Sequence, residues 1–455
     1  MRDRIWCRRI GWPLFAAAVG ILLLAALCVA YFRYIAPALR ADTDVERAIK
    51  RIAATGAPVE VTQLARPPIA DAENAALVYR RAFEVMRLSD AEKYLDGQIC
   101  SGGASLDDPA TATRAQEILR RNAKTLESVR RAAAMPRCDF RVDWSKGNDV
   151  TFPQFSKLRS CSHLLALYSL VLAHDGRVDD ALAACRDNYR LIKAADEPVI
   201  IGPLVACAIA AIACRAVAAV IHDSQPSIAA CNSLAAEISG IDLTASFVTA
   251  LKGERAWGIS LFEQVRASPD PVKAVLDLAG ESKGEVRHSA LRRGKTLARW
   301  WLAADELTYL DLMAQAIKEA PLPYRKVVHI HPSVEERVES LPRWPPPVMT
   351  AILIPIMSRS QETRDQAIAM LDLAEVALLL KAYRAEHGGY PPTLATVRRP
   401  DGRPLPTDPF SGKPFVYRRE GAGLLIYSWG PNLKDDGGKV AQQRDEGDIV
   451  VRCAR

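Results

Sequence analysis

The sequence predicts a mainly α-helical protein with an N-terminal transmembrane helix, a domain of helical hairpins and a small C-terminal α+β module. Three observations carry this prediction: an uncharged apolar run near the N-terminus, helical apolar spacing over most of the chain, and three short β-type runs near its end. A chain of 455 residues is long enough for two or three domains. The predicted parts are residues 1–40, 42–320 and 349–455, with a proline-rich connector at 321–348.

The N-terminus has the pattern of a membrane anchor. Arg2, Arg4, Arg8 and Arg9 precede an apolar run over residues 11–32 that contains no charged side chain. About 20 apolar residues are enough to cross the hydrocarbon core as a helix. The arginines predict that the N-terminus stays in the cytoplasm and that the chain after residue 40 lies outside it. The alternative is a cleaved signal peptide, which would have a shorter apolar core followed by a small-residue cleavage site.

The segment from Ser162 to Ala194 predicts two helices joined by a tight turn. Apolar side chains recur at helical spacing on both sides of Gly176, a residue type that commonly ends helices. The spacing of Gly176, Ala181 and Leu182 resembles that of a tetratricopeptide (TPR) hairpin. Only one copy of this pattern is present, whereas a true array repeats at a fixed period. The sequence therefore predicts a helical-hairpin domain over residues 42–320.

The stretch from Val199 to Asp223 is apolar enough to suggest a second membrane span. Pro203 and Arg215 interrupt it, and small alanines dominate its composition. We therefore expect a buried core helix here.

The cysteines and the connector give little sign of metal or redox chemistry. The ten cysteines show no CxxC spacing, which removes support for a zinc or thioredoxin-type site. An oxidising compartment would permit a disulfide between Cys100 and Cys138, which flank polar loops. The connector contains His329 and His331, which would share a face of an extended chain. Without a third ligand at a telling spacing, they are expected to be exposed linker residues.

The C-terminal part predicts one long amphipathic helix followed by short strands. The helix is expected from about Thr350 to a stop at Gly388. The expected strands are Pro414–Arg419, Leu424–Trp429 and Asp448–Arg452. The first two, joined through Gly421, predict a hairpin.

Short motifs follow one another in a set order along this part of the chain. They are Ala382-Tyr383-Arg384, His387-Gly388-Gly389-Tyr390-Pro391, Asp408-Pro409-Phe410 with Gly412, Pro414 and Tyr417, Tyr427-Ser428 with Gly430, and Asp448-Ile449. In this order they resemble the major pseudopilin of type II secretion systems, the protein G-like module of the general secretion pathway, and Pro355 matches a helix proline of that family. The helical remainder resembles bacterial envelope proteins of uncharacterised function that end in the same module.

The resemblance implies a pilin-like fold and a link to secretion or envelope assembly. Pseudopilins begin with this helix, whose apolar first half anchors the subunit and builds the filament. Here the helix begins more than halfway along the chain, and the N-terminal apolar run contains no acidic residue. We therefore expect a pilin-like head on a protein of the bacterial inner membrane, with its bulk in the periplasm, and no filament polymerisation.

The resemblance also implies a calcium site near the end of the chain. Asn432, Glu446 and Asp448 align with the family's ligand positions, and Asp435 and Asp436 are additional carboxylates nearby. Calcium requires six to eight oxygen ligands, several of them charged, and Asn432 supplies an oxygen without charge. The alternative is a solvated acidic turn in which Asp448 hydrogen-bonds to the loop backbone.

The expected function follows mainly from the catalytic and nucleic-acid-binding motifs that the sequence lacks. It contains no HExxH, Walker, GxSxG or strand-linked GxGxxG motif. Glu254 and Arg255 would suit a buried ion pair or a site, but a pair on the helix surface or between helices is expected. The formal net charge of +7 is mild, and no nucleic-acid-binding motif accompanies it. The sequence predicts a non-catalytic, membrane-anchored scaffold that binds an envelope protein or peptide. The alternative is an envelope enzyme, such as a hydrolase, with a polar pocket in the helical domain.

Overall fold

A computed structural model describes residue 19 and residues 21–25, 36–279, 295–328, 347–354, 360–440 and 447–454. These residues fall into two compact units. The smaller unit comprises the described residues within Met1–Val59, Gly258–Met313 and Val338–Ile354, and the larger unit those within Glu60–Trp257, Ala314–Arg337 and Pro355–Arg455. The fold is mainly helical with one small antiparallel sheet near the C-terminus, which confirms the predicted fold class at this level.

The smaller unit is built from helices alone among its described residues. It contains α2 (Ala36–Ala54), α12 (Pro271–Ala279), α16 (Val348–Leu353) and parts of α11 (Leu243–Ala267) and α13 (Lys295–Glu319). Ala41 and Val45 of α2 are buried against Ala303 of α13. The boundary between the units therefore falls inside two continuous helices, α11 and α13.

A buried carboxylate on α13 caps the start of α16. Asp305 is 2% exposed and accepts hydrogen bonds from the Met349 amide at 2.7 Å and the Thr350 amide at 3.1 Å. The Thr350 hydroxyl donates to the same carboxylate at 2.6 Å. Burial raises the pKa of Asp305 to about 6, although these three hydrogen bonds oppose the shift.

The larger unit holds most of the helices and the whole described sheet. Its α-helices are α3 (Ala75–Val85), α4 (Leu95–Cys100), α5 (Pro109–Arg121), α6 (Ala123–Ala133), α7 (Pro153–His174), α8 (Val178–Arg190), α9 (Ile201–His222), α10 (Ile228–Ser239), α14 (Tyr324–Val327) and α18 (Ser360–His387). Short 3-10 turns are η2 (Val61–Leu64), η3 (Asp71–Glu73), η4 (Trp144–Asp149), η5 (Leu191–Ala195) and η6 (Leu394–Thr396).

The predicted helical hairpin is present as α7 and α8. Gly176 lies in the connecting turn with a φ of +76°, a conformation that glycine adopts without steric cost. The amide of Arg177 donates to the Leu172 carbonyl at 2.9 Å, which closes the end of α7. The two helices pack along each other, as expected for neighbours joined by so short a turn.

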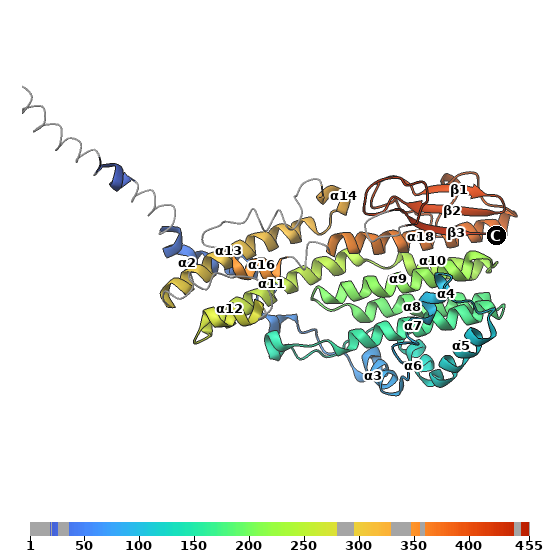
Figure 1. Cartoon of the computed structure of the whole chain (residues 1–455), viewed down its shortest axis with the longest axis horizontal. Helices are drawn as coiled ribbons and strands as arrows, with labels where there is room; N and C mark the ends of the chain where they lie inside the picture. The colour runs from blue at the N-terminus through green and yellow to red at the C-terminus, as the bar shows by residue number, and fades with distance from the viewer. Residues whose placement is uncertain are drawn as a thin grey trace, which may run out of the picture. The chain divides into compact units, whose positions relative to one another are not determined.

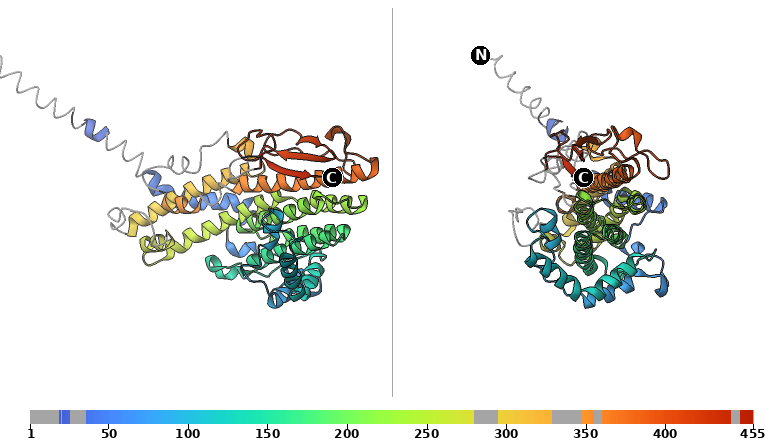
Figure 2. Two further views of the ribbon diagram at one scale, coloured as in Figure 1. Left: turned by 45° about the vertical axis from the view of Figure 1, so that its right-hand side comes forward. Right: turned by 90° about the vertical axis from the view of Figure 1, so that its right-hand side faces the viewer.

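The centre of the larger unit is α9, which packs against α7, α8 and α18. Most of its side chains are buried, so the predicted core helix over Val199–Asp223 is confirmed. Helix α18 packs against both α9 and α10, and all five helices run side by side (Figure 1). Viewed end-on, the sheet lies on one side of these helices and α3, α5 and α6 lie on the opposite side (Figure 2). Residues from the predicted parts 42–320 and 349–455 therefore both contribute to the core of the larger unit.

The sheet has three antiparallel strands in the order β1-β2-β3. They are β1 (Val416–Glu420), β2 (Gly423–Ser428) and β3 (Ile449–Cys453), within two residues of the predicted runs. The β1–β2 hairpin pairs Glu420 with Gly423, and Gly421 takes a positive φ in its turn. Every side chain of the central strand β2 is buried, because its neighbours and α18 cover it.

Two predicted segments are described only in part. In place of one helix from Thr350, the structure describes α16 and α18, and Pro355 lies in the stretch between them that is outside the described residues. The connector contains α14, and His329 and His331 also lie outside the described residues. The start of the connector is held by α18: Arg364 donates to the carbonyls of Ala320 and Leu322, and Asp365 accepts from the Tyr324 amide at 2.6 Å.

The predicted anchor over residues 11–32 lies largely outside the described residues, so it stays a prediction. Among the described residues, Ile201–His222 and the stretch Ile228–Ala267 pass a length-and-composition test for membrane spans. The first of these is the core helix α9, and core helices commonly pass this test.

The described cysteines are all free thiols. The disulfide that an oxidising compartment would permit between Cys100 and Cys138 is therefore not formed in this structure. Cys100 interacts electrostatically with Asp96 and Arg215, whereas Cys138 interacts with Glu197, Arg66 and Asp139, so each thiol has a separate set of neighbours.

Candidate functional site

The acidic loop that follows β2 is closed by the carboxylate of Asp448. This side chain is 1% exposed and accepts hydrogen bonds from the Gly438 amide at 2.7 Å and the Asp436 amide at 3.3 Å. The Asp448 amide in turn donates to the Lys439 carbonyl at 2.8 Å. Burial raises the pKa of Asp448, and the loop amides oppose the shift. Asp448 thus ties the start of β3 to the backbone of the loop.

The other predicted calcium ligands make hydrogen bonds within the same loop. The Asn432 amide donates to Asp436 at 2.8 Å, and Asp435 accepts from the Tyr427 hydroxyl at 2.8 Å and the Gly437 amide at 3.0 Å. Glu446 lies outside the described residues. Over the described part of the chain, no three histidine, cysteine or acidic side chains are placed to hold a metal ion. The loop therefore has the hydrogen bonding expected for a solvated acidic turn, and calcium binding is untested.

Asp408 organises the turn that precedes the sheet. It is 1% exposed and accepts from the amides of Phe410 at 3.0 Å and Ser411 at 3.1 Å. It also accepts from the Ser428 hydroxyl at 2.6 Å and the Trp429 amide at 3.3 Å. One carboxylate therefore joins the Asp-Pro-Phe turn to the end of β2, which gives this motif a structural role.

A polar cavity of about 200 Å³ lies in the larger unit. Its polar lining comes from Arg66 after η2, Tyr79 of α3, Arg190 of α8, Lys193 of η5 and Asp196 after it. Alanines of α3, α6 and η5, with Met135, Pro136 and Cys138, complete the wall. Sequence reasoning did not find this set, because the lining residues come from four separate stretches of the chain.

An acidic residue next to this cavity has a strongly perturbed pKa. Glu197 is 5% exposed, and burial raises its pKa from 4.5 to about 7. Arg66 opposes the shift, while Asp139 and Asp196 reinforce it. Burial also raises the pKa of Cys138 to about 12, so this thiol stays protonated and is a poor nucleophile near neutral pH.

A buried histidine–aspartate pair joins α4 to α7. The His163 Nδ1 atom lies 2.9 and 3.0 Å from the two carboxylate oxygens of Asp96, and both side chains are at most 6% exposed. Tyr94 packs edge-on against the imidazole at 5.1 Å between ring centroids. The local sequence around His163 does not reveal this partner, because Asp96 lies 67 residues earlier in the chain.

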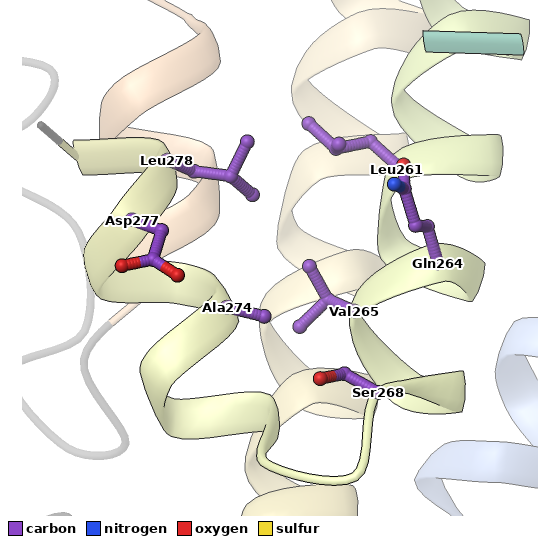
Figure 3. A pocket seen from close by; sticks show the side chains of 7 residues that line it. All are labelled: Leu261, Gln264, Val265, Ser268, Ala274, Asp277 and Leu278. Carbon is purple, nitrogen blue, oxygen red and sulfur yellow. The ribbon is translucent and has the colours of Figure 1, made fainter. Parts of the chain in front are cut away.

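The smaller unit contains a more apolar groove of about 330 Å³ between α11 and α12. Figure 3 shows Leu278 of α12 facing Leu261 and Val265 of α11, with Gln264, Ser268 and Asp277 at its edges. Leu278 is 42% exposed. The groove offers apolar contact and no set of convergent charges.

No family model matches the chain, and no curated protein or solved structure is detectably similar to it. Function is therefore argued from the geometry of these sites and from the sequence.

Proposed function

We propose that the protein is a membrane-anchored, non-catalytic interaction protein whose bulk lies on the periplasmic side of a bacterial inner membrane. The basic N-terminus and the apolar run over residues 11–32 support the anchor and its orientation. The order of the pseudopilin-like motifs supports a role in secretion or envelope assembly. This support is an analogy between folds and does not rest on a shared functional site.

The proposal of a non-catalytic protein rests on the hydrogen-bond partners of three buried carboxylates. Glu254 accepts from the Ile200 amide at the start of α9, Asp305 caps α16, and Asp408 holds a turn. Catalytic acids need a reacting group within hydrogen-bond reach. These three acids are instead within reach of backbone amides that would otherwise lack a partner.

Two finer assignments belong to this proposal. The long helix α18 followed by a three-stranded antiparallel sheet supports a pseudopilin-like head. The α7–α8 hairpin with its Gly176 turn supports a TPR-like contribution to the helical part. Packing of α18 along α9 and α10 leaves less of its surface for filament contacts, which supports a protein that does not polymerise.

The sheet offers a place for an extended partner segment. β1 is an edge strand that pairs, among the described strands, with β2 alone. An edge strand presents unpaired backbone groups to which an extended peptide can add. Arg418, Arg419 and Glu420 are exposed on β1 and would select among partners by charge.

The orientation is tested with reporters fused after Arg455 of the full chain. Alkaline phosphatase, which is active only outside the cytoplasm, should be active, and β-galactosidase at the same position should be inactive. The opposite pattern would sink the proposed orientation.

The interaction is tested with a photo-crosslinking amino acid at Arg419 in cells. Deleting residues 350–455 is unsuitable, because it would remove α18 and expose the buried faces of α9 and α10. We expect one discrete crosslinked product from position 419 and none from Glu127, an exposed position on α6. Identical product patterns at both positions, or no product at either, would contradict a contact through the sheet.

A second candidate function, an envelope hydrolase, is favoured by the Asp96–His163 pair. A carboxylate that holds an imidazole by Nδ1 orients it as a general base in many hydrolases. The test is hydrolysis of p-nitrophenyl acetate by the full chain. Turnover that is lost in His163→Asn would support the enzyme, whereas equal background rates in both proteins would remove it.

A further inference from the structure

The polar cavity of the larger unit combines several hydrogen-bond donors that the fold does not use. Arg66 uses only Nη2, which donates to the carbonyl and the carboxylate of Asp196. Arg190 uses Nε, which donates to Glu237 at 2.8 Å, and its Nη1 atom lies 3.9 Å from the Asp187 carboxylate. Each guanidinium has five N–H donors in a planar fork, so Arg66 and Arg190 keep donors beyond those used in these contacts.

Tyr79 adds a buried donor from another side. It lines the cavity and is 1% exposed, and its hydroxyl forms no hydrogen bond with any described residue. Its ring stacks on Phe83 and Phe140, which fixes its position. This donor would be satisfied by a bound group in the cavity.

The charge of the lining favours an anion. Among the lining residues Arg66, Arg190 and Lys193 are basic and Asp196 is acidic, while Glu237 pairs with Arg190 and Lys193 from outside the lining. Lys193 pairs with Glu237 at 3.5 Å and is 63% exposed, so its ammonium can turn toward a ligand. Arginine forks match the planar, bidentate geometry of carboxylates and phosphates.

We propose that this cavity binds the oxyanion group of a small molecule, a carboxylate or a phosphate. Arg66 and Arg190 donate to its oxygens, and the Tyr79 hydroxyl donates to the same group. At about 200 Å³ the cavity is smaller than the roughly 300–1,000 Å³ of pockets for drug-sized ligands, so the ligand is a small acid.

The experiment is calorimetric titration of the detergent-solubilised full chain with succinate and, separately, with inorganic phosphate. We expect saturable binding of at least one probe in the millimolar range or tighter, and no binding of methylammonium. Comparing the two arms shows whether carboxylate or phosphate is preferred. Absence of saturable binding in both arms would overturn the proposal.

Variants assign the binding to this cavity. Tyr79→Phe keeps the ring and removes only the hydroxyl, so we expect about tenfold weaker binding of the favoured probe. Arg66→Gln should weaken it at least as much. Arg120→Gln, which alters an exposed α5 arginine, should leave the affinity unchanged. Equal affinity in wild type, Tyr79→Phe and Arg66→Gln would show that the probe binds elsewhere and would overturn the proposal.

Discussion

The carboxylate of Glu254 on α11 accepts a hydrogen bond from the Ile200 amide, 2.7 Å away, at the start of the central helix α9. The first amides of a helix have no partner inside it, so this side chain satisfies one of them from a neighbouring helix. Burial raises the pKa of Glu254, and the Ile200 amide opposes the shift. The ion pair expected at Glu254 and Arg255 stays a prediction, whereas the contact of Glu254 with the Ile200 amide is observed.

Removing this contact should destabilise the larger unit. Glu254→Ala leaves the Ile200 amide without its partner in a buried place, which should cost about 1–3 kcal/mol of unfolding free energy. Glu254→Gln keeps an acceptor oxygen of the same reach and should cost less. Urea unfolding followed by circular dichroism measures both, and equal losses in the two variants would contradict the capping role.

Glycine at position 253 allows α11 to approach the chain before α9. A Cβ built on Gly253 would lie 1.6 Å from the Pro198 carbonyl oxygen. Because that oxygen belongs to the backbone, the chain itself would have to move to make room. Gly253→Ala should therefore destabilise the protein by about 3 kcal/mol.

The matched control for this substitution is Gly97→Ala on α4, where a Cβ would meet nothing within 4 Å. This variant should stabilise the fold by about 0.5–1 kcal/mol, because alanine restricts the unfolded chain. The same urea titration applies, and a tolerated Gly253→Ala would show that the approach of α11 is adjustable.

Glu197 should make stability depend on pH. Because burial raises its pKa from 4.5 to about 7, the folded state binds the proton more tightly than the unfolded state. The unfolding free energy should therefore fall as the pH rises from about 4.5 to about 7. Above that range the protein keeps the full loss of stability that comes from burying the ionised carboxylate. At 1.4 kcal/mol for each pKa unit, the penalty is about 3 kcal/mol.

Glu197→Gln removes this ionisation and tests the assignment. It should raise the unfolding free energy by up to about 3 kcal/mol at about pH 8 and by little at about pH 4.5. The exposed α6 variant Glu127→Gln is the control and should show no such difference. A gain that is the same at both pH values would mean that Glu197 does not titrate in this window.

The stability of the acidic loop should depend on Asp448 whether or not calcium is present. Asp448→Asn places an amide nitrogen where an acceptor is needed and should cost about 1–3 kcal/mol in the presence of a chelator. Asp90→Asn, on a carboxylate that is 98% exposed, should be neutral.

Calcium itself is tested by thermal melting of the full chain with millimolar calcium or chelator. Because both oxygens of Asp448 already accept from loop amides, we expect the same Tm in each condition. A rise in Tm with calcium that Asp448→Asn abolishes would instead establish the site.

The sequence by itself determined the local elements of this protein. The apolar spacing around Gly176 specified a helical hairpin, the alanine-rich run after Val199 specified a core helix, and the β-type runs specified three strands within two residues. These features were readable because periodicity and turn residues act over a few neighbouring positions.

Only the tertiary structure decided which elements share a core and which side chains meet. It packs α18 against α9 and α10, pairs Asp96 with His163 across 67 positions, and gathers Arg66, Tyr79 and Arg190 around one cavity. It also turns Asp448 toward the amides of its own loop. Such partners depend on the packing of distant segments, and the local pattern around each residue contains no information about which distant segment will face it.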